Sequence, residues 1–337
     1  MRHVKKVIAV LIAGTLAIAE VGCKSNRTAG NIKKPVERHS YLAANIVSRK
    51  GNNLITMKKV LNYKKNTQGY NAVSLPSNCG NIEVKYINEP ELKIDASVYV
   101  SGNDKDYEKS MLKDLYLKLK DENGKIEILP YRGENMLFEK AADYNRTKCL
   151  VKLNYSIQIP KNIKNIELGS TAGTIKTDKI NCDTLKVETI CGKFISQGIR
   201  ANEITLEATK SNVKMNGKTI CDDMKTKVIT GDCCINLFNG CINASTANTA
   251  FKISNGNLRG ESTIEGSGAT ALEINKMYEN SCLDIKSYAG NVNLKIGKNA
   301  KCKLNYNHLD TNKNGSKVFN GGGAEINVEL SGGKLKF

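Results

Sequence analysis

The residues best placed for acid–base chemistry are the adjacent carboxylates Asp222 and Asp223, which are followed by Lys225 and Lys227. Clustered carboxylates beside a basic residue can transfer protons or bind Ca²⁺, as a polysaccharide lyase or hydrolase on a β-helix requires. Adjacent aspartates in a turn, however, more often cap their own backbone. The chain has no Trp, and aromatic residues make up only 6% of it, whereas glycan-processing clefts depend on aromatic platforms. The pattern therefore favours a structural role for the pair, with a glycan-processing enzyme as the alternative.

Histidine and cysteine provide no recognisable catalytic or metal-binding motif. The three histidines are His3, His39 and His308, and the eleven cysteines include no C-x-x-C pair. No H-E-x-x-H, G-x-S-x-G or phosphate-binding-loop pattern occurs either. We therefore predict a non-enzymatic protein with no catalytic residue, no metal and no cofactor. Most cysteines stand where a small apolar residue would fit, so they are interpreted as interior residues, with some pairing between neighbouring repeats left open.

Cys23 is the residue with a specific expected modification. A basic start is followed by Val7–Ala19, thirteen residues without a charge. This stretch is too short for a membrane-spanning helix, which needs about 20 residues, and is typical of a signal peptide. Val21-Gly22-Cys23 resembles the end of a bacterial lipobox, in which the cysteine becomes lipidated, although Glu20 stands where an apolar residue is usual.

The predicted location follows from this signal. We expect a signal peptide over residues 1–22 and a lipid on Cys23 that holds the protein on the outer face of the cytoplasmic membrane or at the cell surface. Cleavage after Ala19, followed by secretion, is the alternative. Residues 23–45 are polar and basic, as expected of a tether.

The net charge of +18 predicts anionic partners, because a basic surface attracts polyanions. For an exported protein we expect wall polymers, anionic lipid headgroups or acidic glycans, with host glycans or other surface proteins as further candidates. Nucleic acid is not expected, since no Arg-rich block or RNA-binding aromatic motif is present. The alternative is that the lysines only solvate strand faces and oppose pairing between sheet edges.

Residues 46–160 are predicted to form a small β-rich part with one short helix. Asp104 is a candidate cap for a helix over Tyr107–Leu112. Asn123-Gly124 separates two alternating apolar–polar runs, which is a strong hairpin signal because both turn residues must accept a positive φ.

Residues 161–337 contain a repeat of strand-like fragments. The fragments Gly173-Thr174-Ile175, Gly192-Lys193-Phe194, Ser211-Asn212-Val213 and Gly231-Asp232-Cys233 are spaced by 19, 19 and 20 residues. A fixed period with strand patterning predicts a β-helix or β-solenoid, since one repeat cannot bury its apolar face alone. Ile175, Phe194 and Val213 should then stack in the interior, with Leu185 and Ile204 in a second column. After Gly240 the spacing loosens, and an antiparallel sandwich is the alternative.

Three segments resemble the DUF4097 "putative adhesin" family. They are Gly80-Asn81-Ile82-Glu83-Val84, the strand Tyr155–Pro160 that ends in proline, and the repeats of the type Ser170–Ile175. The resemblance covers roughly residues 74–337 and implies an all-β domain of stacked short strands displayed at the cell surface. In some members it implies a link to cell-envelope stress, and it implies no ligand or catalytic residue. We therefore expect a non-enzymatic, adhesin-like or envelope-associated protein that presents a basic solenoid face; an envelope-stress sensor or a structural spacer is the alternative.

Overall fold

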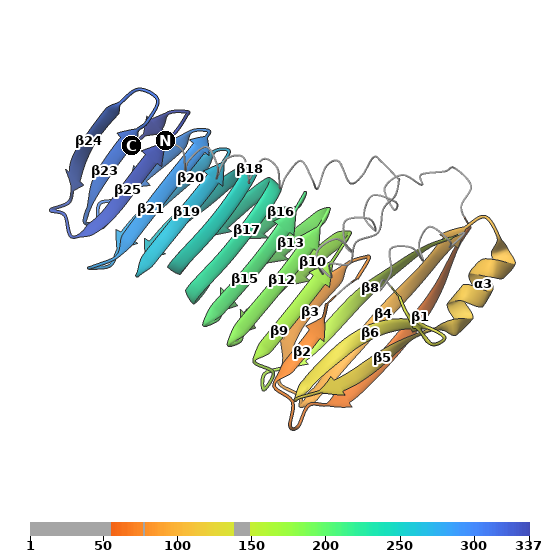
Figure 1. Ribbon diagram of the computed structural model, residues 1–337. Helices are drawn as coiled ribbons and strands as arrows, with labels where there is room; N and C mark the ends of the chain where they lie inside the picture. The colour runs from red at the N-terminus through yellow and green to blue at the C-terminus, as the bar shows by residue number, and fades with distance from the viewer. Residues whose placement is uncertain (1–54, 77, 138–148) are drawn as a thin grey trace, which may run out of the picture.

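The computed structural model describes residues 55–337, apart from residue 77 and residues 138–148. The predicted signal peptide, the tether and Cys23 therefore lie outside the described residues. The described chain is mostly β-structure with a single helix, and its strands stack into an elongated solenoid (Figure 1). The predicted all-β solenoid is thus confirmed.

An antiparallel sheet forms the N-terminal end of the solenoid. Strand β4 (Glu91–Gly102) pairs with β1 (Ile55–Asn66) on one side and with β8 (Cys149–Pro160) on the other. Helix α3 (Lys105–Asp114) contacts β4 and β1 at this end (Figure 1). The Asp104 carboxylate accepts a hydrogen bond from the backbone N–H of Tyr107 at 3.0 Å, so the predicted helix and its cap are confirmed.

The predicted hairpin is also present. Strands β5 (Leu115–Glu122) and β6 (Lys125–Arg132) pair antiparallel, and the short β7 (Asn135–Met136) pairs with the far end of β6. The turn residues Asn123 and Gly124 have φ values of 51° and 74°, which is the left-handed conformation that an Asn-Gly turn supplies.

The solenoid consists of two long parallel stacks whose apolar faces meet in the interior. The first stack begins at β6 and continues through β2 (Ala72–Leu75), β9 (Asn165–Ser170), β12 (Thr184–Ile190), β15 (Glu203–Thr209), β17 (Thr219–Asn236), β18 (Phe238–Leu258), β19 (Glu261–Ser267) and β21 (Cys282–Ala289). The second stack continues from β8 through β3 (Ile82–Ile87), β10 (Gly173–Thr177), β13 (Gly192–Ser196), β16 (Asn212–Met215), the second halves of β17 and β18, β20 (Thr270–Met277), β22 (Val292–Ile296) and β26 (Leu335–Lys336). The short strands β11 (Ile180–Asn181) and β14 (Ile199–Arg200) form a narrow third side.

The predicted interior columns are present in the observed register. Ile175 pairs with Phe194, and Phe194 pairs with Val213, all three fully buried. Leu185 and Ile204 are likewise paired and buried in the first stack. Stacked neighbours of this kind bury the apolar face that a single repeat would leave in water.

The stacks begin earlier in the chain than residue 161. Val84 of β3 pairs with Thr177 of β10, and Val73 of β2 pairs with Ile166 of β9. Residues 72–87 therefore belong to the solenoid stacks and not to a separate N-terminal part. Strand β4, helix α3, the hairpin and β8 are inserted in the chain between this first turn and β9, whereas β1 precedes the first turn and pairs with β4.

The C-terminal end departs from simple sequential order. Strand β25 (Ala324–Leu330) lies between β21 and β23 (Cys302–His308), although β23 comes first in the chain. Strand β24 (Lys313–Phe319) then pairs antiparallel with β23 and ends the stack. This excursion explains why the repeat spacing loosens towards the C-terminus.

A column of glycines lies at one corner between the two stacks. Gly173 has a φ of +133°, and a Cβ on this residue would collide with the carbonyl oxygen of Gly80 in the preceding turn. A Cβ on Gly192 would collide with the carbonyl oxygen of Gly173 in the same way. Close backbone approach at this corner therefore requires glycine at positions 173 and 192, which begin two of the sequence repeats.

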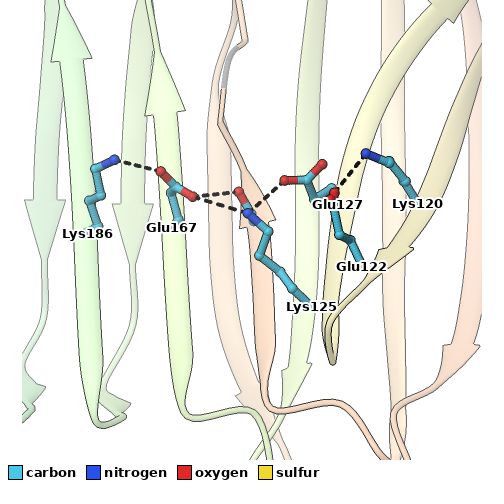
Figure 2. Close-up of polar contacts among 7 residues, drawn as sticks. Lys120, Glu122, Lys125, Glu127, Glu167 and Lys186 are labelled. Atoms are coloured by element: carbon cyan, nitrogen blue, oxygen red, sulfur yellow. Dashed lines mark hydrogen bonds and ion pairs between the residues drawn. The ribbon is translucent and has the colours of Figure 1, made fainter.

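Charged side chains connect the hairpin to the first turns of the solenoid (Figure 2). The Glu167 carboxylate accepts hydrogen bonds from Lys186 at 2.8 Å and from the Ser74 hydroxyl at 2.9 Å. Lys125 lies 2.7 Å from Glu127 and 3.9 Å from Glu167. Burial raises the pKa of Glu167, but the hydrogen bonds from Lys186 and Ser74 outweigh burial, and the pKa is lowered overall. Glu167 is therefore ionised at neutral pH and links three strands.

Candidate functional site

The two broad outer faces of the solenoid carry charges of opposite sign. On the second stack, the outward side chains that alternate with the core include seven lysines and three carboxylates; we call this surface the lysine face. Its charged residues are Lys85, Lys176, Lys193, Lys214, Lys252, Lys295 and Lys336, with Glu83, Asp232 and Glu273.

The first stack presents the opposite balance, with eleven carboxylates and six lysines; we call it the acidic face. Its charged residues are Glu127, Glu167, Glu188, Glu203, Glu207, Asp223, Glu261, Glu265, Asp284, Glu325 and Glu329, with Lys125, Lys186, Lys225, Lys227, Lys286 and Lys303. The excess of lysine that the sequence predicts on a solenoid face is thus confined to one of the two broad faces.

A single column of the lysine face has a regular composition. Lys176, Lys214 and Lys252 occupy every second turn of this column. Ile195 and Cys234 fill the turns between them. Adjacent strands are about 4.8 Å apart, so successive lysines of the column are about 9–10 Å apart. The column therefore alternates cationic and apolar positions along the solenoid axis.

Lys214 and Lys252 are the free cations of this column. Both are exposed, and neither takes part in an ion pair with another described residue. Lys176 lies 3.4 Å from Glu83 at the start of the column. The two free lysines are thus available to an external anion without losing an internal partner.

A ladder of asparagines runs beside the column. The Asn236 side chain donates to the carbonyl of Asn216 at 3.3 Å, Asn255 donates to Asn236 at 3.2 Å, and Asn275 donates to Asn255 at 3.2 Å. Asn216 lies two residues beyond Lys214, and Asn236 two residues beyond Cys234. Residues two apart in a strand point to the same face, so amide groups lie next to the lysines and can bond hydroxyl groups of a ligand.

The structure separates the two adjacent aspartates into different surroundings. Asp222 pairs with Arg259 at 2.6 Å, whereas Asp223 lies 3.3 Å from Lys225 and accepts from Asn243 at 3.1 Å. The strand register shifts between Ile220 and Asp223, and this irregularity directs the two side chains to different neighbours. Each aspartate is thus held in an ion pair of its own.

The other predicted residues join no cluster. Lys225 also pairs with Glu203 at 2.9 Å, and Lys227 is exposed on the acidic face. His308 bonds the carbonyl of Gly333 at 3.0 Å near the C-terminal end. Within the described ranges, no group of three or more His, Cys, Asp or Glu side chains is arranged to hold a metal ion.

The structure describes the side chains of nine cysteines, and all nine are free thiols. Five of them, Cys79, Cys182, Cys221, Cys233 and Cys302, are buried in the core, as expected of interior residues. Burial raises the pKa of Cys79 to about 11 and the pKa values of Cys182 and Cys221 to about 12. These thiols therefore stay protonated and unreactive at neutral pH. Pairing between neighbouring repeats is not found among these nine.

The fold and its charged faces define a class of protein: a two-stack β-solenoid with one basic and one acidic broad face. The chain belongs to the Toastrack DUF4097 family, whose model matches residues 118–321. No curated protein matches the chain. No helix in the described part of the chain is long and apolar enough to cross a membrane.

Several solved structures are similar to this chain over most of its length. A "putative adhesin" from Bacteroides fragilis is 10% identical with a TM-score of 0.39, covering 83% of this chain and 97% of that one. A "putative adhesin" from Parabacteroides merdae is 13% identical with a TM-score of 0.41, covering 84% and 96%. A "putative lipid binding protein" from Parabacteroides distasonis is 10% identical with a TM-score of 0.42, covering 83% and 97%.

Proposed function

We propose that this protein is a non-enzymatic binding protein of the cell envelope that holds an anionic polymer along its lysine face. The observation that carries the proposal is the column Lys176, Lys214 and Lys252, in which a lysine recurs every second turn and the last two take part in no ion pair with a described residue. An extended polymer with regularly spaced phosphates or carboxylates can meet several lysines at once, and its remaining groups contact Ile195 and Cys234 between them.

Display at the cell surface is part of the same proposal. It rests on the basic and apolar N-terminal pattern and on the Val21-Gly22-Cys23 sequence. A lipid on Cys23 would hold the solenoid at the membrane, where envelope polymers are the first polyanions it meets. The acidic face would then keep the protein from adhering to anions on all sides.

Neutralising the free lysines of the column is expected to weaken polymer binding selectively. The double variant Lys214→Gln/Lys252→Gln should lose about 1 kcal/mol per lysine, the contribution of a basic side chain at an anionic surface, and so bind about 30-fold more weakly in total. The measurement is titration of the protein with polyphosphate and with polygalacturonate at low salt, with dextran as the uncharged polymer.

The matched control is Lys227→Gln/Lys286→Gln on the acidic face, because it removes the same charge from two exposed lysines. We expect this control to bind like the unmodified protein. Raising the salt concentration should weaken binding of the unmodified protein steeply, because salt screens exposed charges. Equal losses in the two double variants, or an affinity that does not change with salt, would exclude the lysine face as the binding surface.

Membrane attachment is expected to depend on Cys23. Cys23→Ala should move the protein from the membrane fraction to the soluble fraction, since the lipid-bearing thiol is lost. The measurement is fractionation of cells that express each form, with labelling by a fatty acid analogue as an independent readout. Cys79→Ala is a control that removes a buried thiol of the core. A Cys23→Ala protein that stays in the membrane fraction would show that the anchor is wrong.

A further inference from the structure

A hollow lies beside the start of the lysine column. It has a volume of about 570 Å³ and is lined by Lys85, Tyr86 and Ile87 of β3, Gln158 of β8, Asp178 and Lys179 between β10 and β11, and Gln197 between β13 and β14. These residues come from the first solenoid turn, from the inserted sheet and from two later turns. The hollow therefore exists only where the insertion meets the stacks.

Two lysines line the hollow and can attract an anion. Lys179 is exposed and in no ion pair with a described residue, and Lys85 lies a loose 3.8 Å from Glu83. Asp178 is the one carboxylate among the lining residues. The ammonium groups can bind a phosphate or carboxylate, and the Asp178 carboxylate can accept from a hydroxyl group.

Two glutamines add the means to recognise hydroxyl groups. Among the described residues, neither the Gln158 nor the Gln197 carboxamide has a hydrogen-bond partner. A carboxamide offers two donor hydrogens and an acceptor oxygen, so the pair can bond several hydroxyls of one sugar ring. Binding of a free anion requires no carboxamide. The presence of the two carboxamides next to the lysines therefore points to an anionic polyol.

Tyr86 provides a fixed wall for the hollow. Its hydroxyl donates to the carbonyl of Ile163 at 3.2 Å. Burial raises the pKa of Tyr86, so the hydroxyl stays protonated and keeps this hydrogen bond. An aromatic ring beside hydroxyl-binding groups gives the apolar face of a sugar a surface to pack against.

We propose that this hollow is a subsite for a sugar unit that carries a phosphate or a carboxylate, at the end of a polymer that lies on the lysine column. The placement of this subsite at the end of a polymer rests on the proposed function. Residues of the hollow and of the column share strands: Lys176 is two residues before Asp178, and Glu83, which pairs with Lys176, is two residues before Lys85. The hollow thus lies directly beside the N-terminal end of the column, on the same turns as Glu83 and Lys176.

The test measures binding of small probes to the full protein by NMR titration. The probes are glucose 1-phosphate, glucuronic acid, glucose and inorganic phosphate. We expect glucose 1-phosphate or glucuronic acid to bind, and the preference between them identifies the anionic group. Lys179→Gln and the double variant Gln158→Ala/Gln197→Ala should each weaken that binding about tenfold. Lys218→Gln is the matched control, because Lys218 is exposed at the corresponding corner two turns away and does not line the hollow.

The outcomes separate this subsite from the polymer surface. Sugar binding that is lost with the hollow variants and unchanged in Lys214→Gln/Lys252→Gln supports the subsite, even if no polymer binds. Polymer binding with no detectable binding of either charged sugar overturns the subsite and leaves the proposed function standing. Inorganic phosphate that binds as tightly as glucose 1-phosphate would also overturn it, since only an anion would then be recognised.

Discussion

Phe194→Ala is expected to reduce the free energy of unfolding by about 3–5 kcal/mol, the usual cost of truncating a buried phenylalanine. Phe194 is fully buried and pairs with Ile175 on one side and with Val213 on the other. Because each turn of a solenoid contacts only its neighbours, a cavity here weakens the connection between two sections of the array. The measurement is urea unfolding followed by circular dichroism.

The adjacent substitution Lys193→Ala is the control for this prediction. Lys193 is exposed on the same strand, so its loss should change stability by no more than about 0.5 kcal/mol. In Phe194→Ala, hydrogen-exchange protection should fall most at β10, β13 and β16. A Phe194→Ala protein within about 1 kcal/mol of the unmodified protein would mean that the interior column is not packed as described.

Gly173→Ala should destabilise the protein by about 3 kcal/mol or more, because it combines backbone strain with a steric collision. The new Cβ would meet the carbonyl of Gly80 in the turn below, and that carbonyl accepts a hydrogen bond from the buried Ser170 hydroxyl. The backbone of two turns must therefore separate or the register must shift. The measurement is thermal and urea unfolding of the purified variant.

The control variant Gly69→Ala separates the cost of backbone strain from the cost of the steric collision. Gly69 also has a positive φ, of +84°, but a Cβ there would meet nothing within 4 Å. We expect it to cost only the strain of a left-handed alanine, about 1–2 kcal/mol. If the Gly173 and Gly69 variants lose the same stability, close approach at the corner is not what requires glycine, and backbone conformation alone explains the repeat.

Local patterns were enough to predict the individual elements of the fold. The hairpin at Asn123-Gly124, the cap at Asp104 and the interior column of Ile175, Phe194 and Val213 all depend on residues close in sequence or one repeat apart. Turns, helix caps and a repeat period can be recognised from the order of residue types along the chain. These features could therefore be derived before any tertiary structure was known.

The candidate site was only partly predictable, because it depends on the register between strands and not only on local patterns. An excess of lysine is visible in composition, but alternation within a strand shows only that neighbouring residues face opposite ways. Which outward residues share a column depends on the register between strands, and so does the separation of charge into a lysine face and an acidic face. Asp222 and Asp223 looked like a pair in sequence, yet a register shift gives each its own partner.

The sequence by itself determined a basic, strand-rich repeat with glycines at fixed corners. Tertiary structure alone decided that β3 pairs with β10 across the whole insertion, that β25 lies between β21 and β23, and that a hollow forms where the insertion meets the stacks. Such pairings join segments far apart in the chain, and no local signal specifies them. They follow from burying both apolar faces at once, which only the assembled solenoid achieves.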